Sequence, residues 1–553
     1  MTSFFAKNND AVVNYGQLRA LVVDDYPGMR SALKITLSNF GLSRIDMAAN
    51  VGEVLFKAQN TRYDLILCDF NLGEGRDGQQ LLEELRHRQL ISLGAVFVMV
   101  TAESGYEKVV ATAELAPDDY LIKPFSSELM RARLDAILLR KQAFAEVYGH
   151  FENHEIDEAI AGCDDIVRNK PKYVVDALRF KGELLNAIGR FEEAEELYRK
   201  VIEMRAVPWA RLGLARSLHE MKKEGEAEEI LHDILDTAPE VVAAYDLLAE
   251  VCTANKDMQG AQQALERGVA VSAKTVRRQQ RLGEVAFANG DLEVAKQAYS
   301  DALEKGRHSI FVGAADFGHL CRVQVEQGDL NGALDTLKKG KMTLQADPEG
   351  QLVGAVVRGL VHTRAGNPAE AERAMDEAAR LSQGGARTDG RLMLDYADTC
   401  MANGRFEQAD AVIREVARNA HDSESLLSKA RQIYEKAGRS DVGDALLKEC
   451  TASVRSLNNE AVILAKKGDY QGALAKLRQA TREAPFNPRI LMNTVWVMLK
   501  HLEAEGLDHD LHDEAKALLE EADRQSPGHP RIATLRGQMK DVEARYGIRR
   551  RDA

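Results

Sequence analysis

The chain has 553 residues, an apolar fraction of 45% and a formal net charge of −13 at pH 7. This length exceeds what one ordinary hydrophobic core serves, so we expect at least two folded units. No apolar run approaches the roughly 18 residues that a membrane span requires, and the N-terminus lacks the pattern of a signal peptide, so we expect no membrane segment and a cytoplasmic location. The acidic balance disfavours nucleic acid as a partner.

Cysteine and histidine spacing does not favour a structural metal. His509 and His512 lie three residues apart, which could place both on one helix face as metal ligands, but we interpret His512 as an exposed helix residue. The cysteines occur singly, with no C-x-x-C pair, so the sequence predicts buried free thiols and neither a zinc site nor a disulfide framework. The cysteines are Cys68, Cys163, Cys252, Cys321, Cys400 and Cys450.

Two basic stretches stand out from the acidic background. The residues Lys274, Arg277, Arg278 and Arg281 could form one basic strip on a helix, and Arg549–Arg551 lie in the last residues. We interpret the first stretch as a solvated face and the second as a frayed tail. A regulator that binds RNA or DNA through the strip is the least favoured of the function classes, because the chain as a whole is acidic.

Strand-like and helix-like runs alternate over the first 140 or so residues. The run ALVV has no polar alternation, as expected of a parallel strand that is buried on both faces. Five strands that alternate with five helices predict an α/β fold with a doubly wound, five-stranded parallel sheet. The predicted strands lie within 18–25, 45–49, 65–69, 95–101 and 119–124, and the predicted helices are 27–40, 51–59, 78–88, 103–114 and one capped by Ser126 or Ser127.

Polar side chains follow these predicted strands at the point where the strands end. Asp24 and Asp25 follow the first strand, and Asp69 ends the third. Thr101 ends the fourth strand and Lys123 follows the fifth. In a doubly wound sheet the carboxyl ends of the strands form the ligand crevice, so we expect these side chains to meet there. Carboxylates, a hydroxyl and an amine together suit a divalent cation and a phosphoryl group.

The ordered set Asp-Asp, Asp, Thr-Ala and Lys-Pro-Phe resembles that of a response-regulator receiver domain, over residues 15–141. The resemblance implies that Asp69 accepts a phosphoryl group from a histidine kinase or a phosphotransfer protein. It also implies a Mg²⁺ site made by Asp24, Asp25, Asp69 and the backbone carbonyl of Asn71. The chain would then be a switch without a dedicated catalytic domain.

The resemblance also assigns roles at the other strand ends. The Lys123 ammonium offsets charge during phosphoryl transfer, and the Thr101 hydroxyl donates to the phosphoryl group. Tyr120 matches the aromatic position that rotates inward when the threonine moves. The alternatives are a solvated acidic cluster with Lys123 as an ion pair, and a Tyr120 that is ordinary core.

The loop after Asp69 departs from the pattern of most receivers. Gly73 stands where proline is usual, and the loop is one residue longer before Asp77-Gly78. This difference concerns the loop geometry and the lifetime of the acyl phosphate, and it leaves the arrangement of charges unchanged.

From about residue 150 a different pattern begins, in which glycine and alanine recur about every 34 residues. This pattern resembles tetratricopeptide repeats over residues 142–546, with up to eleven units and a groove that binds a protein ligand. The 38-residue spacings in the middle imply longer helices or loops. We expect residues 1–14 to be a flexible segment, 547–553 to be a basic tail, and Trp209 and Trp496 to lie in the repeat core. The alanines lie at 194, 261, 295, 333, 371, 409 and 473, with weaker copies at Ala159, Ala227, Gly443 and Ala515.

Two functions follow from this organisation. The first is a two-component response regulator that signals through protein binding by its repeats, with a receiver-mediated homodimer among the implied assemblies. The second is a constitutive scaffold whose receiver serves dimerisation or docking without phosphorylation. The sequence from Ser126 to Gly149 has no proline or internal glycine, so we expect a continuous helix from the receiver into the first repeat.

Overall fold

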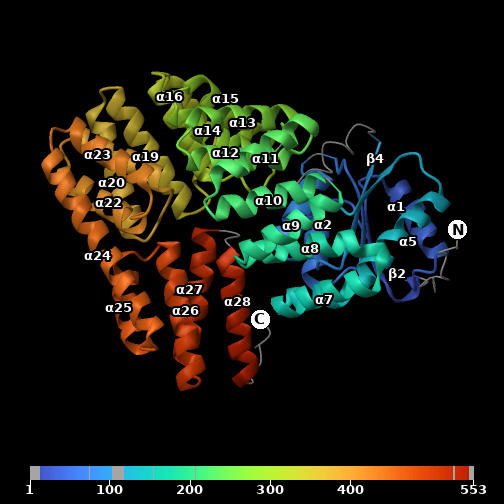
Figure 1. Cartoon of the computed structure of the whole chain (residues 1–553). Helices are drawn as coiled ribbons and strands as arrows, with labels where there is room; N and C mark the ends of the chain where they lie inside the picture. Colours follow the sequence, from blue (N-terminus) through green and yellow to red (C-terminus); the bar gives the residue numbers. More distant parts are fainter. Residues whose placement is uncertain are drawn as a thin grey trace. The chain divides into compact units, whose positions relative to one another are not determined.

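The computed structural model describes residues 13–73, 75–102, 117–153, 155–205, 207–273, 275–526 and 530–546. The chain divides into two compact units. The first unit contains the sheet and the helices up to α13, and the second contains the helices from α14 onward (Figure 1). Several parts of the chain that the sequence analysis named lie outside the described residues. They are the predicted helix 103–114, the tail 547–553, Lys274 and most of the segment 1–14.

The amino-terminal domain is built on a five-stranded parallel sheet with the order β2-β1-β3-β4-β5. The predicted doubly wound sheet is therefore confirmed, and each strand begins and ends within two residues of its expected position. Within the described residues the strands are β1 (Arg19–Val23), β2 (Arg44–Ala48), β3 (Leu65–Asp69), β4 (Val96–Thr101) and β5 (Asp119–Ile122).

Helices cover both faces of this sheet. Ala20 and Val22 of β1 pack with α1 and α5, whereas Leu21 and Val23 of the same strand pack with α2 and α3. Successive side chains of a strand point to opposite faces, so a strand covered on both sides needs an unbroken apolar run. The Ser126 side chain caps α5, which decides between the two predicted caps. The helices are α1 (Pro27–Asn39), α2 (Val51–Asn60), α3 (Gly78–His87) and α5 (Ser127–Ala143).

The helix that leaves the amino-terminal domain is interrupted at one residue. Phe144 ends α5 and begins α6 (Ala145–Glu152), so the expected continuous helix is wrong at this position. The Phe144 side chain is only 1% exposed, and its ring stacks on Tyr148 with 5.6 Å between centroids. The Phe144 and Tyr173 rings form a T-shaped pair, and the Tyr148 and Phe180 rings form another. The two helices therefore meet at one buried aromatic residue, with no flexible linker between them.

Polar contacts also join the α5–α6 junction around Phe144 to the sheet of the amino-terminal domain. The Lys141 ammonium donates to the Leu93 carbonyl at 2.7 Å and pairs with Asp118 at 2.9 Å. The Leu93 N–H donates to Glu152 of α6 at 2.7 Å. Leu93 and Asp118 shortly precede β4 and β5, so the junction lies at the amino-terminal edge of the sheet. The carboxyl ends of the strands remain free of it.

The first unit continues as pairs of antiparallel helices. Small residues let these helices approach, because a Cβ at Gly182 or Gly213 would lie 2.5 or 2.3 Å from the Tyr198 ring. The Tyr198 side chain therefore fills the gap between neighbouring helices, as the repeat pattern predicts. The helices are α7 (Ile156–Asn169), α8 (Val174–Ala187), α9 (Phe191–Met204), α10 (Pro208–Glu220), α11 (Glu224–Thr237), α12 (Val242–Ala254) and α13 (Met258–Val271).

The second unit is also made of paired helices within its described part. The middle repeats are longer, which explains the 38-residue spacings. The connection 306–313 between α15 and α16 lengthens the first interval, α18 and the 17 residues of α19 lengthen the second, and the 16 residues of α20 lengthen the third. The helices are α14 (Val276–Ala288), α15 (Leu292–Lys305), α16 (Ala314–Glu326), α17 (Leu330–Lys339), α18 (Lys341–Leu344), α19 (Pro348–Arg364), α20 (Pro368–Gln383), α21 (Gly390–Ala402), α22 (Phe406–Asn419), α23 (Glu424–Lys436), α24 (Ser440–Lys466), α25 (Tyr470–Glu483), α26 (Pro488–Glu505), α27 (His509–Gln525) and α28 (Pro530–Tyr546).

Helix α24 departs from the repeat pattern because it is a single helix of 27 residues. Its first half packs against α23, and its second half packs against α25. It therefore serves as the second helix of one repeat and the first helix of the next, with no turn between them. The missing turn accounts for the short interval between Gly443 and Ala473.

The tight turns inside the repeats use left-handed backbone. The glycines predicted for these turns have the expected positive φ, at +78° for Gly189, +78° for Gly290 and +73° for Gly404. Lys222 and Lys256 occupy the same place in their turns, each with φ of +64°. A residue with a Cβ is strained in this region, whereas glycine is not.

Glycine at position 222 or 256 is therefore expected to stabilise the protein, by about 0.5–1 kcal/mol, because the relief of strain exceeds the entropy that glycine costs. The midpoint of urea unfolding of the full chain should rise in Lys222→Gly and Lys256→Gly. Gly290→Ala is the matched control, because no atom lies within 4 Å of the added Cβ and only the backbone is strained. A midpoint that falls in both lysine variants would contradict this account.

Several residues that the sequence singled out prove to be structural. The six cysteines are free and buried, as predicted. His512 is only 4% exposed and its Nε2 lies 3.2 Å from Glu543, so its interpretation as an exposed residue is wrong. Arg278 is buried and Arg277 lies over the Phe311 ring, which breaks up the basic strip. Among the described helices, none combines the length and apolar content that crossing a membrane would need.

Candidate functional site

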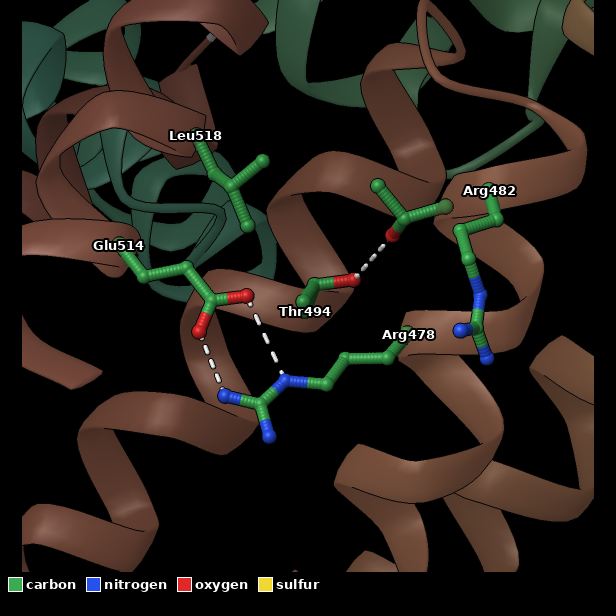
Figure 2. Close-up of a pocket in the computed structure, with 6 residues that line it drawn as sticks. Arg478, Arg482, Thr494, Glu514 and Leu518 are labelled. Atoms are coloured by element: carbon green, nitrogen blue, oxygen red, sulfur yellow. Dashed lines mark hydrogen bonds and ion pairs between the residues drawn. The ribbon is translucent and has the colours of Figure 1, made fainter. Parts of the chain in front are cut away.

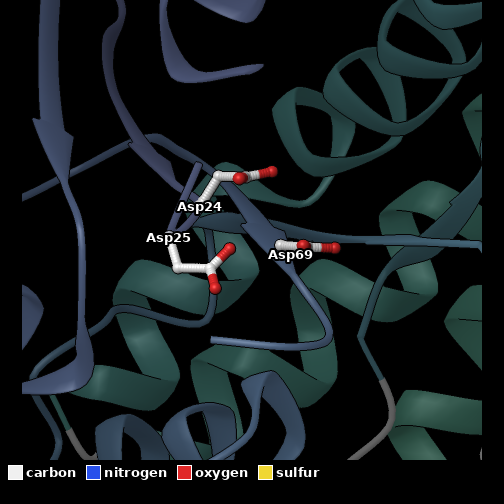
Figure 3. Close-up of side chains that lie close together, drawn as sticks. All are labelled: Asp24, Asp25 and Asp69. Carbon is white, nitrogen blue, oxygen red and sulfur yellow. The ribbon is translucent and has the colours of Figure 1, made fainter. Parts of the chain in front are cut away.

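Three carboxylates converge at the carboxyl ends of β1 and β3. Asp24 and Asp25 come directly after Val23, the last residue of β1, and Asp69 is the last residue of β3. One oxygen of each carboxylate lies within 4.8 Å of the others (Figure 3). Asp24 is 1% exposed whereas Asp25 is exposed, so the cluster opens to solvent on one side. The parallel sheet thus brings together the three acids that the sequence proposed.

Lys123 brings one positive charge to this cluster. Its Nζ lies 3.3 Å from Asp24 Oδ2 and 3.1 Å from Asp69 Oδ1. The Lys123 N–H donates to the Thr101 carbonyl at 2.7 Å, which holds the end of β5 beside the end of β4. One ammonium offsets only one of three carboxylate charges, so the cluster keeps a net negative charge that a cation could balance.

The environment of Asp69 favours its protonated form. Burial raises the pKa of the Asp69 carboxyl above its ordinary value, and the negative charge of Asp24 adds to this effect. The ion pair with Lys123 and the hydrogen bond from the Phe70 N–H, at 3.0 Å, act in the opposite direction. An added cation would relieve the same penalty, because it stabilises the charged carboxylate.

The remaining predicted residues lie at the same edge of the sheet or next to it. Thr101 ends β4 and is 2% exposed. Tyr120 lies in β5, and its side chain is buried with Met99 in the core between the sheet and α2 and α3. Asn71 is exposed in the loop that follows Asp69. The structure therefore places Thr101 at the end of β4, Asn71 in the loop after Asp69 and Tyr120 in the core of the domain, and their roles stay predictions.

A glycine shapes the site in a way that the sequence analysis did not identify. A Cβ at Gly78 would lie 2.6 Å from the Asp69 carbonyl oxygen and 2.7 Å from the Met99 sulfur. Any larger residue at the start of α3 would therefore displace the backbone of Asp69. The sequence signal was the Asp77-Gly78 pair, which we interpreted only as part of a turn. Arg76 and Glu84, near the same loop, also escaped the sequence analysis.

A pocket of about 240 Å³ lies within the second unit (Figure 2). Its volume is below that of most small-molecule sites. Its two arginines are exposed, and the charge of Arg478 is already offset by Glu514, with 2.5 Å between Nη2 and Oε2. The acidic cluster of the receiver is therefore the better candidate site. The pocket is lined by Arg478, Thr481, Arg482, Thr494, Glu514 and Leu518.

The comparison with known families agrees with this geometry. Residues 20–135 match the family model of the response regulator receiver domain. Tetratricopeptide repeat models match residues 185–251, 362–434 and 428–497. The chain is a receiver domain followed by tetratricopeptide repeats. The architecture predicted from the sequence is confirmed, and none of these family models describes a catalytic output domain.

Curated relatives match the receiver. Chemotaxis protein CheY-3 of Vibrio cholerae is 28% identical over 131 residues, which are 24% of this chain and 98% of CheY-3. The transcriptional regulatory protein ResD of Bacillus subtilis is 32% identical over 124 residues, which are 22% of this chain and 49% of ResD. The chain thus spans nearly the whole of CheY-3 and about half of ResD.

Solved structures match each part separately. The chemotaxis response regulator CheY4 of Vibrio cholerae is 28% identical, with a TM-score of 0.20, and the match covers 22% of this chain and 98% of CheY4. A tetratricopeptide repeat protein from Parabacteroides merdae is 13% identical, with a TM-score of 0.29, and the match covers 44% of this chain and 93% of that protein.

The donor set of the receiver cluster fits Mg²⁺. Magnesium prefers a few carboxylate oxygens and keeps several waters, and the exposed side of Asp25 leaves room for solvent. Asp24, Asp25 and Asp69 would hold the ion, with the Asn71 carbonyl as a fourth predicted ligand. Because Asp24 is buried and Asp69 is partly buried, water would screen the attraction between the ion and these carboxylates less than it does in bulk solvent.

Because of Asp69, the stability of the folded protein is expected to depend on both magnesium concentration and pH. The Asp69 pKa is raised in the folded state, so the stability that Asp69 contributes is present below its unfolded pKa and is lost as pH rises through the folded pKa. Without magnesium, Asp69→Asn should therefore be more stable than the wild type at neutral pH. Magnesium at 100 times its Kd should add about 2.7 kcal/mol to the wild type and much less to the variant.

Thermal unfolding of the full chain, with and without magnesium chloride at pH 5 and pH 7.5, tests this prediction. Magnesium should stabilise less at pH 5, because protons compete for the carboxylates. Asp165→Asn, at an acid of α7 that is 65% exposed, is the control and should respond to magnesium as the wild type does. Equal stabilisation of wild type and Asp69→Asn would contradict the assignment.

Proposed function

We propose that this chain is a phosphorylation-controlled response regulator in which Asp69 accepts a phosphoryl group and the tetratricopeptide repeats bind a protein partner. The observation that carries the proposal is the convergence of three carboxylates and the Lys123 ammonium within one open cluster. The family match of residues 20–135 supports it. The phosphoryl donor is a histidine kinase or a histidine phosphotransfer protein, as is usual for the receiver family.

The transfer follows from the position of Asp69. An oxygen of its carboxylate attacks the phosphorus of a phosphohistidine, an O–P bond forms, and the P–N bond breaks with its electron pair leaving on the imidazole. Lys123 lies on the same carboxylate and is placed to offset charge on the phosphoryl oxygens. Mg²⁺, when bound, supplies further positive charge at these oxygens. Hydrolysis by water returns Asp69 to its free carboxylate and releases phosphate.

The response to phosphorylation would begin at β4 and β5. The Thr101 hydroxyl would donate to the phosphoryl group, and Tyr120 would follow the movement of Thr101. The backbone bond from Lys123 to Thr101 links these two strands next to the site. The other ends of β4 and β5 adjoin Leu93 and Asp118, which contact Lys141 at the junction. The two strands therefore connect the site with the first repeat.

The output would be protein binding and not the turnover of a metabolite. The repeats bury large residues between neighbouring helices, as Tyr198 does against Gly182 and Gly213. Repeat surfaces of this kind bind peptides or helices in their groove. The partner of this groove would be a protein.

Labelling with a small phosphodonor tests the first half of the proposal. With radioactive acetyl phosphate and magnesium chloride, the wild-type chain should acquire an acid-stable, base-labile label. Asp69→Asn should lose it almost completely, because the nucleophile is removed. Asp165→Asn, an exposed acid outside the cluster, should be labelled at the wild-type level. Labelling of Asp69→Asn at that level would contradict the role of Asp69.

One observation favours a second candidate function, a constitutive scaffold. Lys123 already pairs with both Asp24 and Asp69, so two of the acids have a partner without any ion. In this case the receiver would serve dimerisation or docking, and beryllofluoride with magnesium would leave the hydrogen exchange of the wild type unchanged. The labelling experiment separates the two functions, because a scaffold would not be labelled.

The coupling between receiver and repeats has its own test. Beryllofluoride with magnesium should change the hydrogen exchange of α6 and α8 in the wild type, because the junction is rigid. A Gly-Ser spacer inserted after Gln142 should abolish this change while labelling of Asp69 persists. The same spacer after Gly385, in the turn that follows α20, is the control and should preserve it. An unchanged response in the first variant would contradict coupling through the junction.

A further inference from the structure

The acceptor loop, residues 70–73 and 75–77, connects β3 with α3 and is held firmly at its two ends. At the first end, the Phe70 N–H donates to the Val100 carbonyl at 2.8 Å, which continues the sheet by one residue. At the other end, the Gly78 N–H donates to the Phe70 carbonyl at 2.8 Å. Asp77 and Gln80 form a capping box, with their side chains accepting at 2.8 and 3.1 Å. Both ends of the loop are therefore fixed.

Between these ends, the described loop residues 71–73, 75 and 76 form no backbone–backbone hydrogen bonds with other described residues. Gly73 stands at the place of the usual proline and has φ of +78°, and Gly75 has φ of +129°. Glycine is unstrained in these conformations. It also gives the loop many other accessible conformations, so fixing a single one costs more conformational entropy. Proline would have removed this freedom. A loop with two such glycines needs another contact to keep one geometry.

Glu84 supplies a contact of this kind from α3. Its side chain is 0% exposed, although it is a carboxylate on a helix that faces solvent on one side. Its partners are Arg76 of the acceptor loop, in direct contact, and Arg88 on the same helix at 2.7 Å. A buried carboxylate is costly unless it is paired, so Glu84 favours the loop conformation that delivers the Arg76 guanidinium.

Arg76 is connected to the predicted metal site by the loop residues that precede it in the chain. A Cβ at Gly73 would lie 3.3 Å from Asp25 Oδ2, so the loop backbone passes directly over one of the predicted ligands. Leu72 is buried in the core with α3, and Asn71 beside it offers the predicted carbonyl ligand. A change in the path of residues 75 and 76 would therefore move the backbone that faces Asp25.

We infer that Arg76 is a positioning residue that, through its ion pair with Glu84, takes over the role of the missing proline and holds the acceptor loop in the geometry that binds the metal. This inference rests on the proposed function, because it assigns the loop to a Mg²⁺-dependent phosphoryl acceptor. Arg76 touches neither the phosphoryl group nor the ion. It acts on the Asn71 carbonyl and on the space above Asp25.

The chain offers a matched control for the test. Arg76 and Arg88 pair with the same carboxylate, but Arg88 lies at the end of α3, away from the loop. Arg76→Gln and Arg88→Gln therefore remove the same charge and leave Glu84 with one partner each. In the full, metal-free chain, amide hydrogen exchange of the acceptor loop should become several-fold faster in Arg76→Gln and remain at the wild-type rate in Arg88→Gln.

A second measurement tests whether the conformation of the acceptor loop affects the affinity of the site for a divalent cation. The Kd for Mn²⁺, read from the electron paramagnetic resonance signal of the free ion, should rise about tenfold in Arg76→Gln, as for residues that orient metal ligands. It should stay near the wild-type value in Arg88→Gln. Arg76→Lys keeps the positive charge and should retain most of the Mn²⁺ affinity. If the shape of the arginine side chain were what mattered, the lysine variant would bind as weakly as Arg76→Gln.

The outcomes separate this inference from the proposed function. Equal exchange and equal Mn²⁺ affinity in Arg76→Gln and Arg88→Gln would overturn the positioning role, even if the wild type is labelled by acetyl phosphate. A wild type that is not labelled would overturn the proposed function, while the exchange experiment in metal-free protein would still decide whether Arg76 holds the loop. Because Arg76 is partly exposed in a loop, its variants should fold.

Discussion

Repulsion among three carboxylates at one edge of the sheet is the constraint around which the receiver is arranged. Asp24 and Asp69 are withdrawn from water, and Lys123 offsets one of the charges. A cation would offset the remaining negative charge of the cluster. Burial is the main cause of the raised pKa of Asp69, and the negative charge of Asp24 adds to it. Gly78 lets α3 lie directly against the backbone of Asp69, because a Cβ at this position would meet the Asp69 carbonyl oxygen.

The same sheet gives the domain two functional edges. The carboxyl ends of the strands hold the acids, and the amino-terminal ends of β4 and β5 meet the α5–α6 junction through Lys141 and Asp118. The phosphodonor and the repeats would then use opposite edges of one rigid sheet. The aromatic cluster around Phe144 supports this connection, since the Phe144 ring packs against Tyr148 of α6 and Tyr173 of the first repeat region.

The repeat array shows how a fold tolerates departures from its own pattern. Lys222 and Lys256 adopt the left-handed backbone that glycine takes in the other turns, because the helices on both sides impose it. Helix α24 omits a turn and still packs on its neighbours. Each repeat contacts mainly the next one along the chain, so such irregularities stay local and do not propagate.

The sequence by itself determined the order of strands and helices, the acids at the strand ends and the existence of repeats, because burial on both faces and helix pairing leave direct periodic traces. It did not reveal that Phe144 interrupts the helix, that His512 is buried, or that Glu84 of α3 pairs with Arg76 of the acceptor loop. These facts depend on contacts between residues that lie on different elements. A charged or aromatic side chain has the same appearance in the sequence whether it faces water or a partner, and only the tertiary structure decides which.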